Sequence, residues 1–348
     1  MKRQDHHYVA QFHQRGFVEK DGDQLWVYDR KWKSYRQKHP RALCKEPDLY
    51  TLGSKDGKED RAIETEVLSV IEDQAARLIA QIAPGFVPTR LDIRRLVCFI
   101  AIQWTRVPSF IRTAGAMIEA QYDEWLRLRF GTLESASQAL AQPEKATNTP
   151  QISPEKMVHA VLNGRVKAHT NKAWDIQTIF DHANPLGVWL EHCQWTILVA
   201  PSDGSFIVSD NPFVSVPPEE MRCESLCYAA PGVTNYFPLT RTLCLMARQG
   251  GSFTFSYRKV DSQSVRTVNL NTAANSERYI MAAGRTQLES IVNGSACYGE
   301  AEPRLSIEVD RPNRYESLQT MTLVPRRYFY SGQLPPLSAQ RSQGRPTK

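Results

Sequence analysis

Apolar residues repeat every three or four positions between residues 63 and 82, which predicts an amphipathic helix. Thr89 and Asp92 then have the spacing of a capping box at the start of a second helix. Residues 96–102 are apolar on every side of that second helix. Because a helix without a polar face is buried, we expect a central core helix near residues 91–107.

The pattern changes to short apolar runs and alternation in the second half of the chain. Residues 195–199 and 206–209 are rich in strand formers and flank a turn sequence, which predicts a β-hairpin. Residues 242–247 and 253–257 flank a glycine pair and predict a second hairpin. Residues 265–283 then predict another helix.

These elements predict an α+β fold in one large domain, residues 1–330. Within it, residues 1–60 carry an N-terminal sequence box and a small β-hairpin. Residues 61–192 are helical, and residues 193–330 mix antiparallel hairpins with helices. The last segment, 331–348, is polar and contains proline and glycine, so we expect a disordered tail.

Composition narrows the class of protein without identifying it. The 348 residues are 41% hydrophobic and 23% charged, which is ordinary for a globular protein. No apolar run is long enough to cross a bilayer, and the start of the chain lacks the apolar stretch of a secretory signal. Seven cysteines, an odd number, fit reduced thiols better than a disulfide framework, so we expect a cytoplasmic protein without membrane contact. The net charge of +6 favours an anionic partner such as nucleic acid.

Two adjacent histidines near the N-terminus are the first candidates for chemistry. His6 and His7 project in different directions, so one could bind a metal while the other forms a hydrogen bond. Under the alternative interpretation they are capping residues. The terminal segment is then held in place by Tyr8, Phe12 and Phe17.

An acidic residue inside an apolar stripe is the second candidate. Glu64 lies within the stripe of the first predicted helix, whereas Glu66 lies at its edge and Glu72 well outside it. A carboxylate that faces a core is costly unless it is paired or bound to a metal. Alternatively, Glu64 lies in the first helical turn, still in contact with water and favoured by the helix dipole.

The most apolar helix carries two polar residues near its end, Gln103 and Arg106. Buried polar groups need partners, and an arginine offers two parallel donors to a carboxylate or a phosphate. The alternative is a buried salt bridge between Arg106 and Glu64 or a neighbouring acid.

Asp210 directly follows an apolar strand in the sequence Ser-Asp-Asn-Pro, 209–212. Acids at strand ends are well placed to bind metals, although these residue types also favour an Asx-turn. Asn271, Asn275 and Arg278 share one helix face by their spacing, which is typical of the solvated side of a helix.

The order of these segments resembles the domain-of-unknown-function family 4238, which is found mainly in bacteria. The opening box is His6-His7-Tyr8-Val9-x-Gln11-Phe12-x-x-Arg15-Gly16-Phe17. Similar segments follow in the family's order at 25–29, 103–108, 206–212 and 237–239, with a late helix that carries Asn269 and Arg278. The chain departs from the family at Ala10, where proline is usual, and at His13-Gln14. The resemblance implies a shared fold but no known activity.

The leading hypothesis from the residues is a divalent-metal-dependent phosphodiesterase or nuclease, in which the metal activates water. The metal ligands would be His7, Glu64 and Asp210. The catalytic side chains would be His6, His7, Gln103 and Arg106. The arginine would stabilise the phosphate charge, and the unligated histidine would act as general base. The alternative is a non-catalytic binding or defence-associated protein in which these residues form a structural network.

Overall fold

The computed structural model describes residues 5–53, 59–60, 62–141, 152–218 and 228–295, together with strands β14 (Leu305–Ile307) and β15 (Met321–Leu323). The tail expected at 331–348 lies outside these residues. Helices dominate the first half of the described chain, and strands alternate with helices in the second half. The predicted α+β fold with an N-terminal hairpin is therefore confirmed.

The central helix is α3 (Arg90–Thr105), and most of its apolar side chains are buried. Its start is the predicted capping box, because the Thr89 hydroxyl accepts from the Asp92 N–H and the Asp92 carboxylate accepts from the Thr89 N–H. Helices α2 (Ser69–Gln81) and α7 (Lys172–Glu191) pack against α3. The predicted core helix is confirmed.

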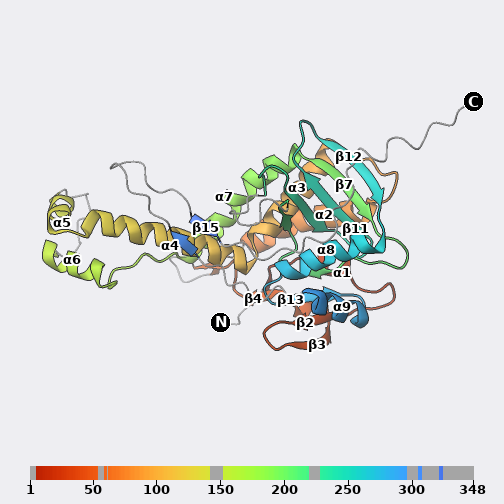
Figure 1. Cartoon of the computed structure of the whole chain (residues 1–348), viewed down its shortest axis with the longest axis horizontal. Coiled ribbons are helices and arrows are strands. Elements are labelled where there is room, and N and C mark those ends of the chain that lie inside the picture. Colours follow the sequence, from red (N-terminus) through yellow and green to blue (C-terminus); the bar gives the residue numbers. More distant parts are fainter. Residues whose placement is uncertain are drawn as a thin grey trace, which may run out of the picture.

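A five-stranded sheet lies against this helical layer, in the order β12-β7-β11-β10-β9. Its strands are β7 (Gln194–Val199), β9 (Val214–Val216), β10 (Thr234–Pro238), β11 (Leu243–Arg248) and β12 (Thr254–Lys259). One face of the sheet packs on α2, α3 and α7, and the other packs toward a second, smaller sheet. Figure 1 shows the helices and the larger sheet together in the body of the molecule.

Both hairpins predicted in the second half are wrong. Strand β7 pairs antiparallel with β11 and parallel with β12, so β11 and β12 are not neighbours. The strand expected to pair with β7 is β8 (Val208–Ser209), which belongs to the smaller sheet. Because β7 is buried over Trp195–Leu198, it takes a central place between two later strands. The hairpin that does form joins β10 to β11.

The smaller sheet has the order β3-β2-β13-β8. The predicted N-terminal hairpin is present as β2 (Leu25–Asp29) and β3 (Ser34–Lys38). The helix predicted over 265–283 extends too far. Helix α8 (Ser262–Asn275) ends earlier, and the last predicted helical residues form strand β13 (Tyr279–Ala282). Helix α9 (Arg285–Ser295) packs against β2 and β13 on one face of this sheet.

An elongated helical arm extends from the body (Figure 1). It contains α4 (Pro108–Phe130), α5 (Leu133–Leu140) and α6 (Pro154–Leu162). The remaining short elements are β1 (Asp5–His7), α1 (Gln11–Arg15), η1 (Pro40–Ala42), β4 (Lys45–Pro47), β5 (Leu52–Gly53), β6 (Glu59–Asp60) and the π-helix η2 (Ile63–Leu68). Among the described helices, none combines the length and apolar character that a bilayer span requires.

His13 fixes α1 in the core between the helical layer and the larger sheet. Its Nε2 donates to the Pro238 carbonyl oxygen at 2.6 Å, and its ring stacks on Phe237 at 4.9 Å between centroids. Burial lowers the pKa of His13 from 6.5 to about 4. The imidazole is therefore neutral in the folded protein at neutral pH.

This buried histidine predicts a pH dependence of the free energy of unfolding. Between pH 4 and 6.5, His13 is protonated in the unfolded chain but stays neutral in the folded protein. The free energy of unfolding therefore falls as the pH falls through this window. The loss from this group is about 3 kcal/mol at the acid end. Urea denaturation at several pH values should give a flatter profile for His13→Phe than for the wild type. An unchanged slope would show that His13 titrates normally.

Candidate functional site

Gln103 attaches the N-terminal box to the core helix. Its Nε2 donates to the Tyr8 carbonyl oxygen at 2.6 Å, and its Oε1 accepts from the Ala10 N–H at 3.2 Å and from Arg106 Nη2 at 2.7 Å. Gln103 is fully buried, so each of these bonds replaces one lost to water. The amide is thus occupied by the chain itself, and the box lies directly against α3.

The two histidines have different surroundings. His6 is buried, accepts from the Tyr50 N–H through Nδ1 at 3.0 Å and stacks on the Tyr50 ring. His7 is half-buried, and its Nδ1 and Nε2 lie 3.3 Å from Gln11 Nε2 and from the Arg41 carbonyl oxygen. Burial lowers the pKa of His7, which also lies within the electrostatic reach of Arg106. The charges of Glu72 and Arg106, described next, also act on the pKa of His7.

Arg106 carries a buried positive charge at the end of α3, with only 1% of its surface exposed. Its Nη1 donates to Glu72 Oε1 at 2.7 Å, and the Tyr50 hydroxyl donates to its carbonyl oxygen at 3.3 Å. Burial works against the charge, but the Glu72 carboxylate holds the pKa of Arg106 above its usual value. The ion pair therefore joins the buried Arg106 to a partly exposed Glu72.

Glu64 lies in the same cluster. Burial raises its pKa, Arg106 opposes that shift, and Glu72 adds to it. The buried Glu64 Oε2 and Arg106 Nε have no hydrogen-bond partner among the described residues. The charge of Arg106 therefore acts on two carboxylates, although among the described residues only that of Glu72 lies within ion-pair distance. This cluster contains the predicted residues His7, Glu64, Gln103 and Arg106.

Glu72 forms the ion pair with Arg106. A salt bridge from Arg106 to Glu64 or a neighbouring acid was one predicted alternative, but Glu72 was not among the residues predicted for the site. A regular α-helix would place Glu72 well away from Glu64, but residues Ile63–Leu68 form a π-helix. Its i→i+5 bonds widen the turn and rotate the positions that follow. The acid opposite Arg106 therefore could not be identified from a helical wheel.

Asp210 has a different place in the fold. Its Oδ1 accepts from the Glu277 N–H at 2.9 Å, and its Oδ2 accepts from the Arg278 and Tyr279 N–H groups at 2.6 and 3.0 Å. Burial raises the pKa of Asp210, and these three bonds oppose that shift. The carboxylate thus accepts hydrogen bonds from the three backbone N–H groups that connect α8 to β13 and stabilises this connection.

The structure does not bring the three predicted metal ligands together among the described residues. In this part of the chain, no group of three or more His, Cys, Asp or Glu side chains is arranged to hold a metal ion. Glu64 and His7 lie near Arg106, whereas Asp210 is bound to the α8–β13 junction. Gln103 and Arg106 therefore belong to one hydrogen-bonded network and Asp210 to another.

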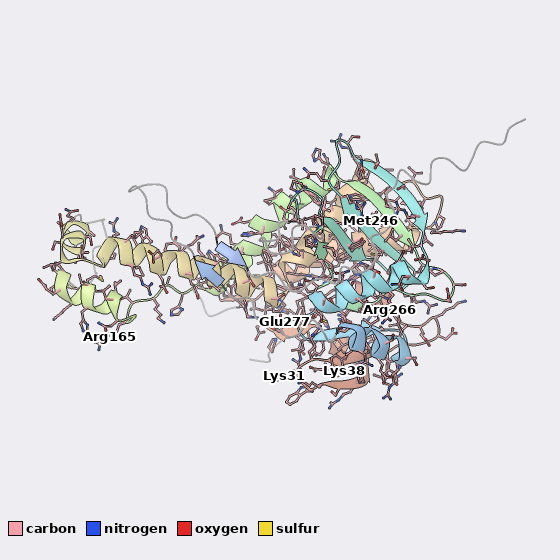
Figure 2. All side chains as sticks on the ribbon, viewed as in Figure 1. Lys31, Lys38, Arg165, Met246, Arg266 and Glu277 are labelled. Atoms are coloured by element: carbon pink, nitrogen blue, oxygen red, sulfur yellow. The ribbon has the colours of Figure 1, made fainter. Side chains whose placement is uncertain are left out.

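The β2–β3 hairpin presents a second candidate site, which the sequence analysis did not single out. Residues 30–45 contain seven lysines and arginines and no acid. Trp32 lies in the turn with 61% of its surface exposed, and the following Lys33 has the left-handed φ of 48°. Figure 2 shows Lys31 and Lys38 on this hairpin at the edge of the molecule. We define the hairpin surface as Lys31, Trp32, Lys33, Arg36, Lys38 and Arg41.

The hairpin surface continues along the edge strand β3 onto the face of the smaller sheet that packs toward the larger sheet. A hollow of about 60 Å³ there is lined by residues of both strands and by Arg278. Arg278 Nη2 pairs with Asp29 Oδ2 at 3.1 Å, and its guanidinium lies over the Tyr279 ring. Lys38 lies over the same ring, 5.8 Å from its centroid. Two cations therefore lie over the Tyr279 ring on this face.

Comparison with known proteins gives one result. The model of the family described as protein of unknown function DUF4238 matches residues 5–286. No curated protein and no solved structure gives a significant match.

Proposed function

Because the chain belongs to DUF4238, a family of unknown function, we propose a function from its own surface: it is a non-catalytic protein that binds nucleic acid through the hairpin surface. The observation that supports this proposal is the dense basic charge of residues 30–45 beside an exposed tryptophan. A cytoplasmic location, which we also propose, would give such a surface access to RNA and DNA.

The charges of the hairpin surface are available to an external partner. None of its lysines and arginines forms a salt bridge within the part of the chain that the structure describes. Arg36 and Lys38 lie two positions apart on β3, so they project from the same face at about 7 Å from each other. Phosphate neutralisation by such residues releases counterions and supplies most of the affinity of sequence-independent binding.

Trp32 adds a stacking platform to this charge. Lys31 Nζ lies 5.2 Å from the centroid of the Trp32 ring, which leaves the opposite ring face for a base. Bases stack on aromatic side chains without regard to sequence, and only unpaired bases can do so. The hairpin surface therefore fits a single strand better than a duplex.

The metal-dependent phosphodiesterase stays a prediction. Arg106 and Glu64 lie near each other, as that hypothesis requires. Asp210, its third metal ligand, is occupied by three backbone donors, so the same residues support the structural network of the alternative hypothesis more directly.

The proposal predicts the effect of two neutralising substitutions on binding. Arg36→Gln with Lys38→Gln should reduce the slope of log K against log salt for a labelled single strand by about 1.4, because two phosphate contacts are lost. Trp32→Ala should weaken binding by about 1–3 kcal/mol through the loss of stacking. Fluorescence anisotropy at several salt concentrations measures both effects.

The matched control is Arg77→Gln with Arg90→Gln, which removes the same charge from exposed positions on α2 and α3. It should change the affinity much less than the hairpin variant. Equal weakening by both pairs would show non-specific attraction to net charge. Stronger binding to anionic vesicles than to nucleic acid would identify a membrane partner and reject the proposal.

A further inference from the structure

A groove between α8 and α9 lies on the opposite side of the smaller sheet from the hairpin surface. Its volume is about 400 Å³, and its lining is polar and apolar in equal parts. The residues that matter here are Ser205, Arg241, Arg266, Asn269, Gly284 and Gln287. Figure 2 shows Arg266 on α8, beside this groove. We propose that the groove binds a small molecule through a phosphate or carboxylate group.

The floor of the groove is fixed by a satisfied amide network. Asn269 Nδ2 and Gln287 Nε2 both donate to the Ser205 carbonyl oxygen, at 2.8 and 2.5 Å. Asn269 Oδ1 accepts from the Ile207 N–H at 3.0 Å, and the Ser205 hydroxyl donates to Gln287 Oε1. A floor held by its own bonds does not need to reorganise when a ligand binds, which lowers the entropy cost of binding.

Two arginines supply positive charge at the walls. Arg266 Nη1 donates to the Ser290 hydroxyl at 2.8 Å, so its guanidinium is held at the wall between α8 and α9. Arg241 is half-buried, and its side chain forms no hydrogen bond or ion pair with the described residues. The acids of the groove, Glu19 and Asp203, are exposed and screened by water. A guanidinium without a protein partner offers two parallel donors to an anionic oxygen pair.

Gly284 lines the groove at the start of α9. A Cβ added at Gly284 would meet no atom within 4 Å, and the glycine does not have a left-handed φ. In contrast, a Cβ at Gly204 would lie 3.0 Å from the ring of Pro201. A large side chain at Gly284 would therefore extend into free space and occupy the groove without displacing the backbone.

The inference is independent of the proposed nucleic-acid function. Helix α9 covers the face of the smaller sheet that carries Trp26 and Tyr28, whereas Arg36 and Lys38 lie on the other face with Val27 and Asp29. A ligand in the groove therefore makes no contact with the hairpin surface. Each site can be tested while the other is intact.

The test is calorimetric titration of the full chain with inorganic phosphate and with citrate, at a constant ionic strength set by chloride. The stronger of the two identifies the preferred anionic group. Arg241→Met and Gly284→Phe should each weaken that binding by about tenfold or more, since one loses a charge-assisted contact and the other fills the groove.

Gly251→Phe is the matched control for Gly284→Phe. Gly251 lies in the connection between β11 and β12, and a Cβ there also meets nothing within 4 Å. This variant should bind the anion as the wild type does, and circular dichroism should show that all three variants are folded. If neither anion binds the wild type, or if Gly251→Phe and Gly284→Phe weaken binding equally, the inference is wrong.

Discussion

Replacing both Glu64 and Glu72 with glutamine should lower the free energy of unfolding by about 3–5 kcal/mol, the usual cost of an uncompensated buried charge. The double variant leaves the buried Arg106 guanidinium without any carboxylate near it. Each single variant should cost less, because the remaining glutamate can ionise and pair with Arg106. Urea denaturation followed by circular dichroism measures all three variants and the non-additivity between them.

An exposed ion pair provides the comparison. Arg94 and Glu191 lie 3.5 Å apart, and their side chains are 55% and 30% exposed. Glu191→Gln should therefore change stability by less than about 1 kcal/mol. Additive effects of the Glu64 and Glu72 substitutions would contradict the shared role, since independent residues do not compensate for each other.

Asp210→Ala should destabilise the fold by about 3 kcal/mol or more, because three backbone N–H groups lose their acceptor and each unsatisfied donor costs about 1–3 kcal/mol. Asp210→Asn should cost less but should not be silent. Its NH₂ group would face at least one of the N–H donors of Glu277, Arg278 and Tyr279. Chemical denaturation of both variants gives these values.

Stability measurements with added divalent metals distinguish this structural role of Asp210 from a role as a metal ligand. If Asp210 serves only the α8–β13 junction, the destabilisation by Asp210→Asn is the same with and without added Mg²⁺, Mn²⁺ or Zn²⁺. If Asp210 were a metal ligand, the wild type would gain stability from one of these ions by mass action and Asp210→Asn would not. A metal-dependent gain confined to the wild type would restore the phosphodiesterase hypothesis.

Local signals explain why the helical half could be predicted from the sequence. The capping box of Thr89 and Asp92 and the apolar run 96–102 are read from a few neighbouring residues, and both have the predicted role. Strand pairing is not local. Strand β7 finds its partners in β11 and β12, much later in the chain, so a short turn after β7 was a poor guide to its neighbour.

In the candidate site, too, some features could be predicted from the sequence and others could not. The sequence identified Gln103, Arg106 and Glu64 as polar groups in apolar surroundings, and the structure brings them together. It did not reveal Glu72, because a π-helix changes the phase of the helix. The helix stripe with Asn271, expected to be solvated, is buried at that residue because α8 packs against α9, β8 and β9.

The positive charge of the β2–β3 hairpin can be read from the sequence, but it does not stand out in the net charge of the whole chain. A net charge of +6 over the whole chain is a weak signal, whereas seven cations without an acid in residues 30–45 are a strong one. A window of charge along the chain would have found the hairpin surface before its structure was known.

The central place of β7 has a consequence for synthesis on the ribosome. Both of its neighbours, β11 and β12, emerge after it, so the apolar segment Trp195–Leu198 leaves the exit tunnel with two unpaired edges. Unpaired apolar edges recruit other nascent chains, and pairings between distant segments form slowly. We therefore expect the nascent chain to be most prone to aggregation between translation of β7 and translation of β12.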